Sequence, residues 1–325
     1  MSIFDKRVAF KPFEYPEVLE YKNAINHSYW LVSEWNFISD IHDFAVNLSD
    51  TERNAIKNAL LAISQIEVSV KKFWTKLGDR FPKAEFEQIG VTFGESEVRH
   101  ADAYSHLLQV LNLNEDFTLL LENPVIQGRV DYLTKYLKGA SENSNESFTL
   151  ILTLFSIFIE NVSLFSQFVI IKSFNKYKNL LKDVDNVVQA TMKEETIHAL
   201  VGMKLVNVLR EEYPELFDAD LESKILTEAE EAFKCECKII DWILGDYTGE
   251  KLNKDILKEF IKDRLNESLK QIGYKPIFDT LDQTLLDQTE WFVEDVLGET
   301  STDFFHSDPV NYVKNHTPIS EEDLF

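Results

Sequence analysis

Two parts of the sequence place a glutamate and a histidine where an amphipathic helix should carry apolar side chains. Glu97 and His100 interrupt one apolar stripe, and Glu195 and His198 interrupt another. Residues three positions apart are neighbours on one face of a helix, so each Glu-x-x-His motif holds a carboxylate beside an imidazole. Both groups are ligands for first-row metal ions, which makes metal-dependent chemistry the first function to consider.

Two further apolar stripes each contain a single carboxylate, Glu67 in the first and Glu160 in the second. Glu67 precedes the first Glu-x-x-His motif by 30 positions and Glu160 precedes the second by 35. The chain therefore contains an approximate repeat of a helix pair. A chain with seven histidines has nearly one Glu-x-x-His by chance, so the repeat is far more specific than either motif alone.

Four isolated carboxylates would be prohibitively costly to bury unless cations cancelled their charge. Two divalent metal ions cancel four negative charges, and two imidazoles complete the ligand set. This pattern is typical of an all-α fold, the ferritin-like dimetal-carboxylate helical bundle. The expected metal ligands are Glu67, Glu97, His100, Glu160, Glu195 and His198.

Oxygen and imidazole ligands suit iron or manganese, and the lack of thiolate ligands argues against zinc or copper. The two cysteines, Cys235 and Cys237, point to different sides of a helix, so we expect neither a disulfide nor a shared metal between them. Reduced thiols are typical of a cytoplasmic protein. The N-terminus lacks the apolar core of a signal peptide, which agrees with that location.

The elements that must position these residues are long helices. Gly (10) and Pro (8) are scarce, and no stretch alternates convincingly with the period of a strand. We expect an irregular N-terminal segment over 1–50 packed on the bundle, a ferritin-like helical domain over 51–298 and a flexible C-terminal tail over 299–325. The periodicity predicts helices over about 51–77, 83–112, 120–138, 146–174, 180–212, 220–246 and 253–272.

The net charge of −23 argues against two classes of partner, because such a field repels nucleic-acid phosphates and anionic membranes. One stretch, 148–171, is long and apolar enough to cross a bilayer, and Glu160 is its only charge. However, polar uncharged residues recur through it, and a helix that is apolar all round is also typical of the centre of a large bundle. We therefore expect a buried central helix.

The motif Glu97-Val-Arg-His100-Ala-Asp-Ala-Tyr104 resembles the small subunit of class I ribonucleotide reductase, in which Glu-x-x-His is followed four residues later by the radical tyrosine. The segment Lys193-Glu194-Glu195-Thr-Ile-His198 is similar to the second Glu-x-x-His of that family. Glu160 stands at the place of the family's lone glutamate.

Further resemblances lie at both ends of the chain. Ser28-Tyr-Trp30, with Glu34 following, resembles the family's aromatic cluster, whose tryptophan relays an electron. The segment from Phe304-Phe305 through Tyr312 and the acidic, Phe-ended tail resemble the family's C-terminus. The resemblance thus covers nearly the whole chain.

The resemblance implies that this chain is the radical-generating β subunit, active only with a separate large (α) subunit that reduces ribonucleotides, with diphosphates favoured. It implies a homodimer whose C-terminal tail binds the large subunit. The chain would supply a one-electron hole. The implied route leads from the metals through His100 and Glu194 to Trp30, then Tyr312 and the partner.

Three positions depart from the family pattern or bear on the subclass. Glu67 stands where the family usually has aspartate, Glu194 replaces another aspartate, and Tyr104 is retained. A glutamate first ligand with a retained tyrosine is similar to class Id, whose members use a dimanganese centre activated with superoxide. Lys71, one turn after Glu67, is a candidate neighbour of the first metal, or a lysine whose stem extends to solvent.

Under the class Id resemblance the high-valent metal centre is itself the oxidant, and a flavoprotein or another superoxide source is an activating partner. Diiron and manganese–iron centres remain alternatives for the cofactor. Two other functions share the ligand pattern, a ferritin-like ferroxidase or iron store and a dimetal oxidase or desaturase. Ferritin chains are usually much shorter and lack the Trp30 and tail features, whereas a long ligand channel reaching the metals would favour an oxidase.

Overall fold

A computed structural model describes residues 2–70, 72–139 and 144–295, and every regular element in these ranges is helical. The expected all-α, ferritin-like fold is therefore confirmed. The elements of the described ranges are α1 (Val18–His27), η1 (Val32–Glu34), α2 (Ile38–His42), η2 (Asp43–Asn47), α3 (Asp50–Val70), α4 (Lys72–Thr75), α5 (Leu77–Arg80), α6 (Ala84–Val110), α7 (Asn114–Leu120), α8 (Pro124–Gly139), α9 (Asn145–Leu154), η3 (Phe155–Ser163), α10 (Phe165–Lys178), α11 (Lys182–Glu212), η4 (Pro214–Leu216), α12 (Ala219–Leu244), α13 (Lys254–Gln271) and α14 (Gln283–Leu286).

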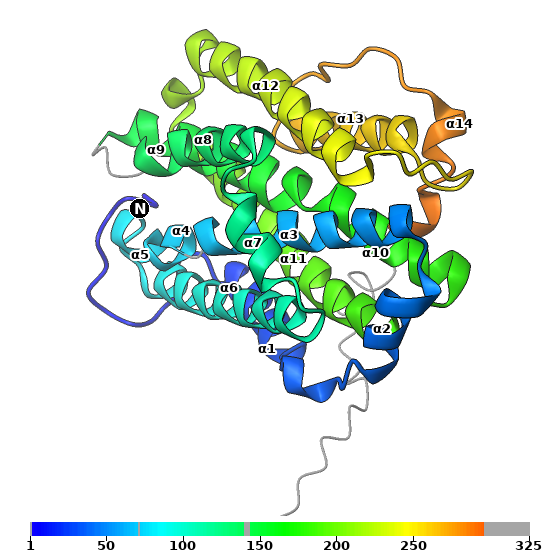
Figure 1. Ribbon diagram of the computed structural model, residues 1–325. Helices are drawn as coiled ribbons and strands as arrows, with labels where there is room; N and C mark the ends of the chain where they lie inside the picture. The colour runs from blue at the N-terminus through cyan, green and yellow to red at the C-terminus, as the bar shows by residue number, and fades with distance from the viewer. Residues whose placement is uncertain (1, 71, 140–143, 296–325) are drawn as a thin grey trace, which may run out of the picture.

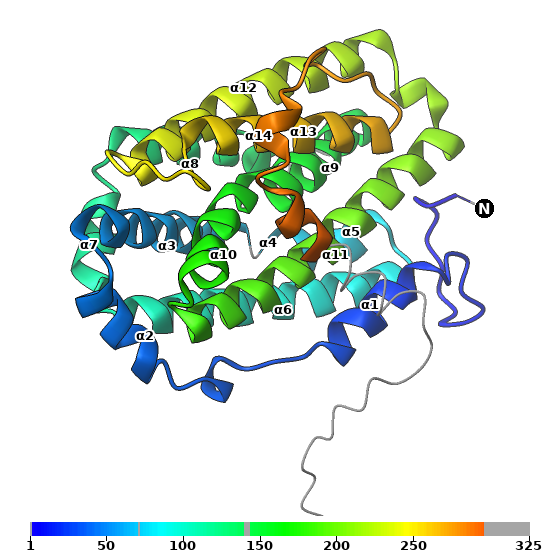
Figure 2. The same ribbon diagram turned by 90° about the vertical axis from the view of Figure 1, so that its right-hand side faces the viewer.

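The long helices pack side by side in layers (Figures 1 and 2). α12 and α13 lie together on one side of the bundle, α6 and α1 lie on the opposite side, and α3, α10 and α11 run between them. α3 contacts α6 on one side and α12 on the other, and α11 packs along η3. Side chains on the inner faces of α3, α6, η3 and α11 therefore converge inside the bundle.

The apolar helix of the sequence is continuous in the structure from α9 through η3 to α10. The stretch 145–178 is long and apolar enough to span a membrane, but 89% of its most apolar window is buried inside the protein. Neighbouring helices cover it, among them α8, α11 and α13. This confirms the expected buried central helix.

The segment η3 is a π-helix, and Glu160 lies within it. π-helical turns are rare and occur frequently at functional sites, because the extra residue per turn changes the direction of a side chain.

The expectation of an irregular segment over 1–50 was wrong for part of its length. α1 packs against α6 and α11, with Val18 and Ile25 buried against the bundle. Only these two positions of α1 are buried, which leaves too narrow an apolar stripe for the periodicity to reveal the helix. The expected domain boundary at 298 and the tail lie outside the described residues.

Candidate dimetal centre

The six residues expected to bind metal come from four helices and meet inside the bundle. Each of these residues is at most 1% exposed to solvent. They form two overlapping sets, and within each set one ligand atom per residue lies within 4.8 Å of the others. The first set is Glu67, Glu97, His100 and Glu195, and the second is Glu97, Glu160, Glu195 and His198.

Glu97 and Glu195 belong to both sets and stand between the two imidazoles. His100 Nδ1 lies 3.0 Å from Glu195 Oε1, 3.8 Å from Glu97 Oε2 and 3.9 Å from Glu67 Oε2. His198 Nδ1 lies 3.1 Å from Glu97 Oε1 and 3.5 Å from oxygens of both Glu160 and Glu195. The arrangement is that of two adjacent ligand sets joined by two shared carboxylates.

Many ligand atoms in this cluster are buried without a hydrogen-bond partner among the described residues. They include both carboxylate oxygens of Glu67 and Glu97, one of Glu195, and the Nδ1 atoms of His100 and His198. A buried polar group left unpaired costs about 1–3 kcal/mol, so a cluster of this kind is unfavourable for the protein alone. Metal ions bound between these atoms would satisfy them, and the donor set fits two such ions.

The electrostatics of the cluster lead to the same conclusion. Burial raises the pKa of Glu67 and of Glu160 well above the ordinary value, and the Glu195 carboxylate adds to both shifts. For Glu195 itself, the close approach of Glu160 and the two histidines outweighs burial and lowers the pKa well below its usual range. Without cations the cluster therefore retains protons, and two divalent ions allow all four carboxylates to ionise together.

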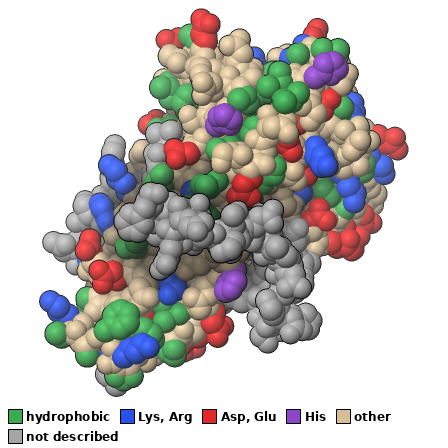
Figure 3. Space-filling view, turned by 90° about the horizontal axis from the view of Figure 1, so that it is seen from below, with side chains coloured by type: hydrophobic (Ala, Val, Ile, Leu, Met, Phe, Trp, Pro, Cys, Tyr) green, Lys and Arg blue, Asp and Glu red, His purple; other side chains and the backbone are tan. Residues whose placement is uncertain are grey.

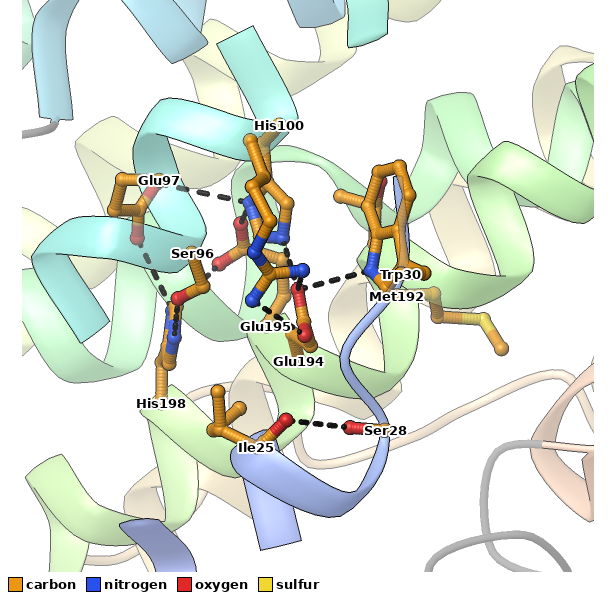
Figure 4. A network of polar contacts seen from close by, with 12 residues as sticks. Ile25, Ser28, Trp30, Ser96, Glu97, His100, Met192, Glu194, Glu195 and His198 are labelled. Atoms are coloured by element: carbon orange, nitrogen blue, oxygen red, sulfur yellow. Dashed lines mark hydrogen bonds and ion pairs between the residues drawn. The ribbon is translucent and has the colours of Figure 1, made fainter. Parts of the chain in front are cut away.

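The outer nitrogen of each imidazole is held by a hydrogen bond, as Figure 4 shows. His100 Nε2 lies 2.8 Å from Glu194 Oε2, and a carboxylate accepts, so Nε2 carries the proton. Ser96 donates its hydroxyl to the Phe93 carbonyl at 2.8 Å and accepts from His198 Nε2 at 2.9 Å. In the neutral, metal-binding form each ring therefore carries its proton on Nε2 and turns the Nδ1 lone pair toward the carboxylates, as a metal ligand requires.

Glu160 is held from outside the cluster as well. Trp74 of α4 donates its indole N–H to Glu160 Oε1 at 2.9 Å. Arg264 of α13 donates Nε to the Asn161 carbonyl at 2.6 Å, and Arg129 of α8 donates to the Ser163 carbonyl. Arginines from two neighbouring helices thus donate hydrogen bonds to backbone carbonyls of the π-helical segment.

Trp30 adjoins the cluster through Glu194. Its indole N–H donates to Glu194 Oε2 at 3.2 Å, and its ring stacks at 6.1 Å from the His100 ring (Figure 4). Arg99 of α6 donates to both oxygens of Glu194, at 3.0 and 3.3 Å. Glu194 therefore connects Trp30 to His100 by two hydrogen bonds.

Tyr104 is buried on α6, one turn after His100. Burial raises the pKa of its phenol, and the Glu67 carboxylate raises it further. Two other residues of interest, Lys71 and Tyr312, lie outside the described residues, as does the segment from Phe304 onwards.

Sequence reasoning did not find Ser96, Trp74, Arg99, Arg129 or Arg264. Ser96 is a buried serine beside a motif glutamate, which is a weak signal. The arginines bind carbonyls and a carboxylate on other helices, so their roles depend on tertiary packing that no local pattern reveals.

Comparison with known proteins places this geometry in a family. The sequence model of "Ribonucleotide reductase, small chain" matches residues 7–284. The chain is 28% identical to the probable ribonucleoside-diphosphate reductase small subunit 048L of Invertebrate iridescent virus 3, over 97% of this chain and 86% of that protein.

Solved structures share the fold. The putative class I ribonucleotide reductase of Bacillus halodurans superposes with a TM-score of 0.79 at 15% identity, over 85% of this chain and 99% of that one. The dimanganese(II) NrdF of Streptococcus sanguinis gives a TM-score of 0.73 at 16% identity, over 88% and 99%. The chain therefore belongs to the ribonucleotide reductase small-chain family, as an oxidoreductase subunit whose buried carboxylate–histidine cluster fits a dimetal site.

Proposed function

We propose that the six clustered residues bind two manganese ions and that this subunit delivers the resulting one-electron oxidising equivalent to a large subunit through Trp30. The observation that carries the proposal is the unbroken contact from His100 through Glu194 to Trp30, with hydrogen bonds of 2.8 and 3.2 Å. The large subunit would use this equivalent to convert ribonucleoside diphosphates into deoxyribonucleotides.

The residues of this chain have separate tasks in that proposal. Glu97 and Glu195 belong to both ligand sets and would be shared by the two metal ions, and the burial of the cluster excludes water. Two bound manganese ions would supply the redox chemistry. When Trp30 loses an electron, Glu194 is placed to accept its indole proton, because Glu194 Oε2 already receives that N–H. Tyr312 continues the proposed route toward the partner.

The choice of manganese and of class Id rests on the ligands. Four carboxylates and two imidazoles without thiolate suit manganese or iron. Glu67 is one methylene longer than aspartate, so its carboxylate would reach farther toward the first metal position. We propose that the centre is activated by superoxide, from a flavoprotein or a similar source, and that the oxidising equivalent remains on the metals instead of Tyr104.

We also propose a homodimer and a cytoplasmic location. Val91 and Val98, two turns apart on α6, are 63% and 48% exposed. Figure 3 shows the molecule from the side of α1, α2 and α6, where hydrophobic side chains lie among charged ones. A second copy packed on helix faces of this side would cover them.

Metal analysis combined with electron paramagnetic resonance tests the proposal. We expect the protein to bind two manganese ions per chain, and the activated form to show a multiline manganese signal and to support deoxynucleotide formation with the large subunit. Replacement of Glu97 or Glu195 should remove both ions, because each is shared by the two sets. Full activity of Trp30→Phe would contradict the route through Trp30.

A further inference from the structure

Trp30 has a second aromatic neighbour on the side away from the metal cluster. The rings of Trp30 and Trp35 lie with centroids 5.5 Å apart and planes tilted by 51°. Trp35 follows η1 directly and is only partly buried, whereas Trp30 is 5% exposed. The two indoles therefore form a pair that leads from the interior toward the surface.

The burial of Trp30 creates a need for such a pair. A group outside the bundle, such as Tyr312 of the proposed route, cannot pack closely on a ring that is 5% exposed, so an oxidising equivalent on Trp30 requires an oxidisable group nearer the surface to pass through. Tyrosine and tryptophan are the side chains that can lose one electron, and two sequence neighbours of Trp30 qualify, Tyr29 and Trp35. Both reach the surface, since Tyr29 is 43% exposed and Trp35 is only partly buried.

Electrostatics separates the two candidates. The Arg99 guanidinium lies over the Tyr29 ring at 4.6 Å, and a fixed cation at that distance opposes the removal of an electron from the ring. Arg99 is also 5.6 Å from the Trp30 ring, but there the Glu194 carboxylate lies closer, at the indole N–H, and offsets the cation. In the part of the chain that the structure describes, no cation lies over Trp35.

We infer that Trp35 is the exit relay for the oxidising equivalent that reaches Trp30. One electron moves from Trp35 to oxidised Trp30, and Trp30 recovers its indole proton from Glu194. The Trp35 indole proton leaves to water, which its partial exposure allows. Trp35 then regains an electron along the proposed route through Tyr312 and a proton from water. This inference rests on the proposed function, because it takes the two-metal centre as the oxidant of Trp30.

The test compares conservative variants of neighbouring aromatic residues. Trp35→Phe keeps an aromatic ring in place but cannot be oxidised at these potentials, whereas Trp35→Tyr can. Tyr29→Phe is the matched control for an exposed aromatic beside Trp30, and Trp242→Phe of α12 is the control for a partly buried tryptophan elsewhere. Each variant is loaded with metal and activated alongside the unchanged protein and Trp30→Phe.

Two rates are measured, deoxynucleotide formation with the large subunit and reduction of the activated centre by a small one-electron reductant without the large subunit. We expect Trp35→Phe to lower both rates by at least about tenfold, with unchanged metal content, unchanged Tm and unchanged affinity for the large subunit. Trp35→Tyr should restore most of both rates, and the two control variants should keep them.

Three results would overturn the exit role. Trp35→Phe could keep both rates while Trp30→Phe loses them, which leaves the proposed function intact. Trp35→Phe could weaken binding to the large subunit while the reduction rate stays unchanged, which makes Trp35 a docking residue. Tyr29→Phe could show the loss expected of Trp35→Phe, which moves the exit to Tyr29. If Trp30→Phe and Trp35→Phe both keep full activity, the proposed route itself fails.

Discussion

The two imidazoles of the metal cluster differ in what holds their outer nitrogens. His100 donates to the Glu194 carboxylate, which Arg99 also binds, whereas His198 donates to the neutral hydroxyl of Ser96. A carboxylate partner makes an imidazole a more basic ligand than a hydroxyl partner does. The two metal positions therefore differ in the basicity of their histidine ligand, although their ligands form a repeat. The position of His100 is the one that Glu194 connects to Trp30.

The Ser96 contact predicts a selective loss of metal. In Ser96→Ala the His198 ring loses the partner that fixes its tautomer, so affinity at the set containing Glu160 should fall by about tenfold or more. Titration with manganese, followed by calorimetry and electron paramagnetic resonance, measures each position. Ser64→Ala is the control, because Ser64 is a buried helical serine whose hydroxyl donates to the Leu60 carbonyl of its own helix. Unchanged affinity in Ser96→Ala would contradict the assigned tautomer.

Tyr104 gives a second prediction at this scale. Phenylalanine keeps the buried ring of Tyr104 and removes only its hydroxyl, and we propose that the oxidising equivalent rests on the metals. Tyr104→Phe should therefore retain substantial reductase activity, whereas Trp30→Phe or Tyr312→Phe should lose most of it. Activity assays and resonance spectra of the same samples decide this. A stable tyrosyl radical that disappears in Tyr104→Phe together with activity would exclude the class Id assignment and leave the family assignment standing.

At the scale of the elements, the segment η3 depends on its neighbours. Arg264 of α13 binds the Asn161 carbonyl at 2.6 Å and stacks over Phe165 at 3.5 Å, and the Asn161 amide donates to Ser268 of the same helix at 2.7 Å. Glu160 precedes Asn161 directly. The direction of the Glu160 carboxylate is therefore set in part by α13, which contributes no metal ligand of its own.

Loss of this contact should disturb one metal position more than the other. Arg264→Met leaves the Asn161 carbonyl without its donor, so the π-helical turn can shift and Glu160 with it. We expect the metal affinity of the set that contains Glu160 and His198 to fall by about tenfold. The metal affinity of the set that contains Glu67 and His100 should change little. Lys262→Met is the control, since Lys262 is a cation on the same helix that pairs with Glu259. Equal losses at both positions would indicate general destabilisation instead.

The sequence predicts an element well when the residues that determine it are close together in the chain. α3 begins at Asp50, where the backbone N–H of Ser49 donates to the Glu52 carboxylate and that of Glu52 donates to the Ser49 hydroxyl, as expected of a capping box. The buried helix around Glu160 was also predictable, because a single charge in an apolar run requires a partner. The π-helical form of η3 was not, because it depends on Arg129 and Arg264 from helices distant in sequence.

The same distinction applies to the candidate site. Its six expected ligands were predictable from a repeated spacing, and the structure brings them together. Ser96, Trp74 and Arg99 act through hydrogen bonds across helix interfaces, which single-helix patterns do not encode. α1 was missed because only two of its side chains are buried.

At the scale of the whole molecule, the family assignment separates metal binding from partner binding. The six clustered residues lie inside the bundle, whereas residues 306–325 lie beyond the described part of the chain and carry the resemblance to a partner-binding tail. Removal of 306–325 should abolish binding to the large subunit, and with it turnover, and leave two metal ions per chain. Sedimentation with the large subunit and metal analysis measure both quantities. Normal turnover by the shortened protein would show that the tail has no such role.

The metal cluster also contributes to the pH dependence of the stability of the whole bundle. In the metal-free protein the folded-state pKa values of Glu67 and Glu160, and of His100 and His198, are raised above their ordinary values. Over the pH range between the ordinary and the raised values, the folded state binds more protons than the unfolded state, so the free energy of unfolding falls as pH rises. Glu195, whose pKa is lowered, acts in the opposite direction but is a single group.

Metal ions replace those protons, so the stabilisation that metal binding provides should increase as pH rises. We expect the Tm of the metal-free protein to fall as pH rises above about 4.5, the ordinary value for glutamate, and the increase in Tm on adding manganese to become larger. Calorimetry of both forms across a pH series measures this. The metal-free variant Glu67→Gln should show a weaker pH dependence, whereas Glu230→Gln, at an exposed position of α12, should match the unchanged protein. A metal-free protein that gains stability with rising pH would show that the cluster does not retain protons. Its four carboxylates would then be charged in the folded protein without the balancing charge that two metal ions are proposed to supply.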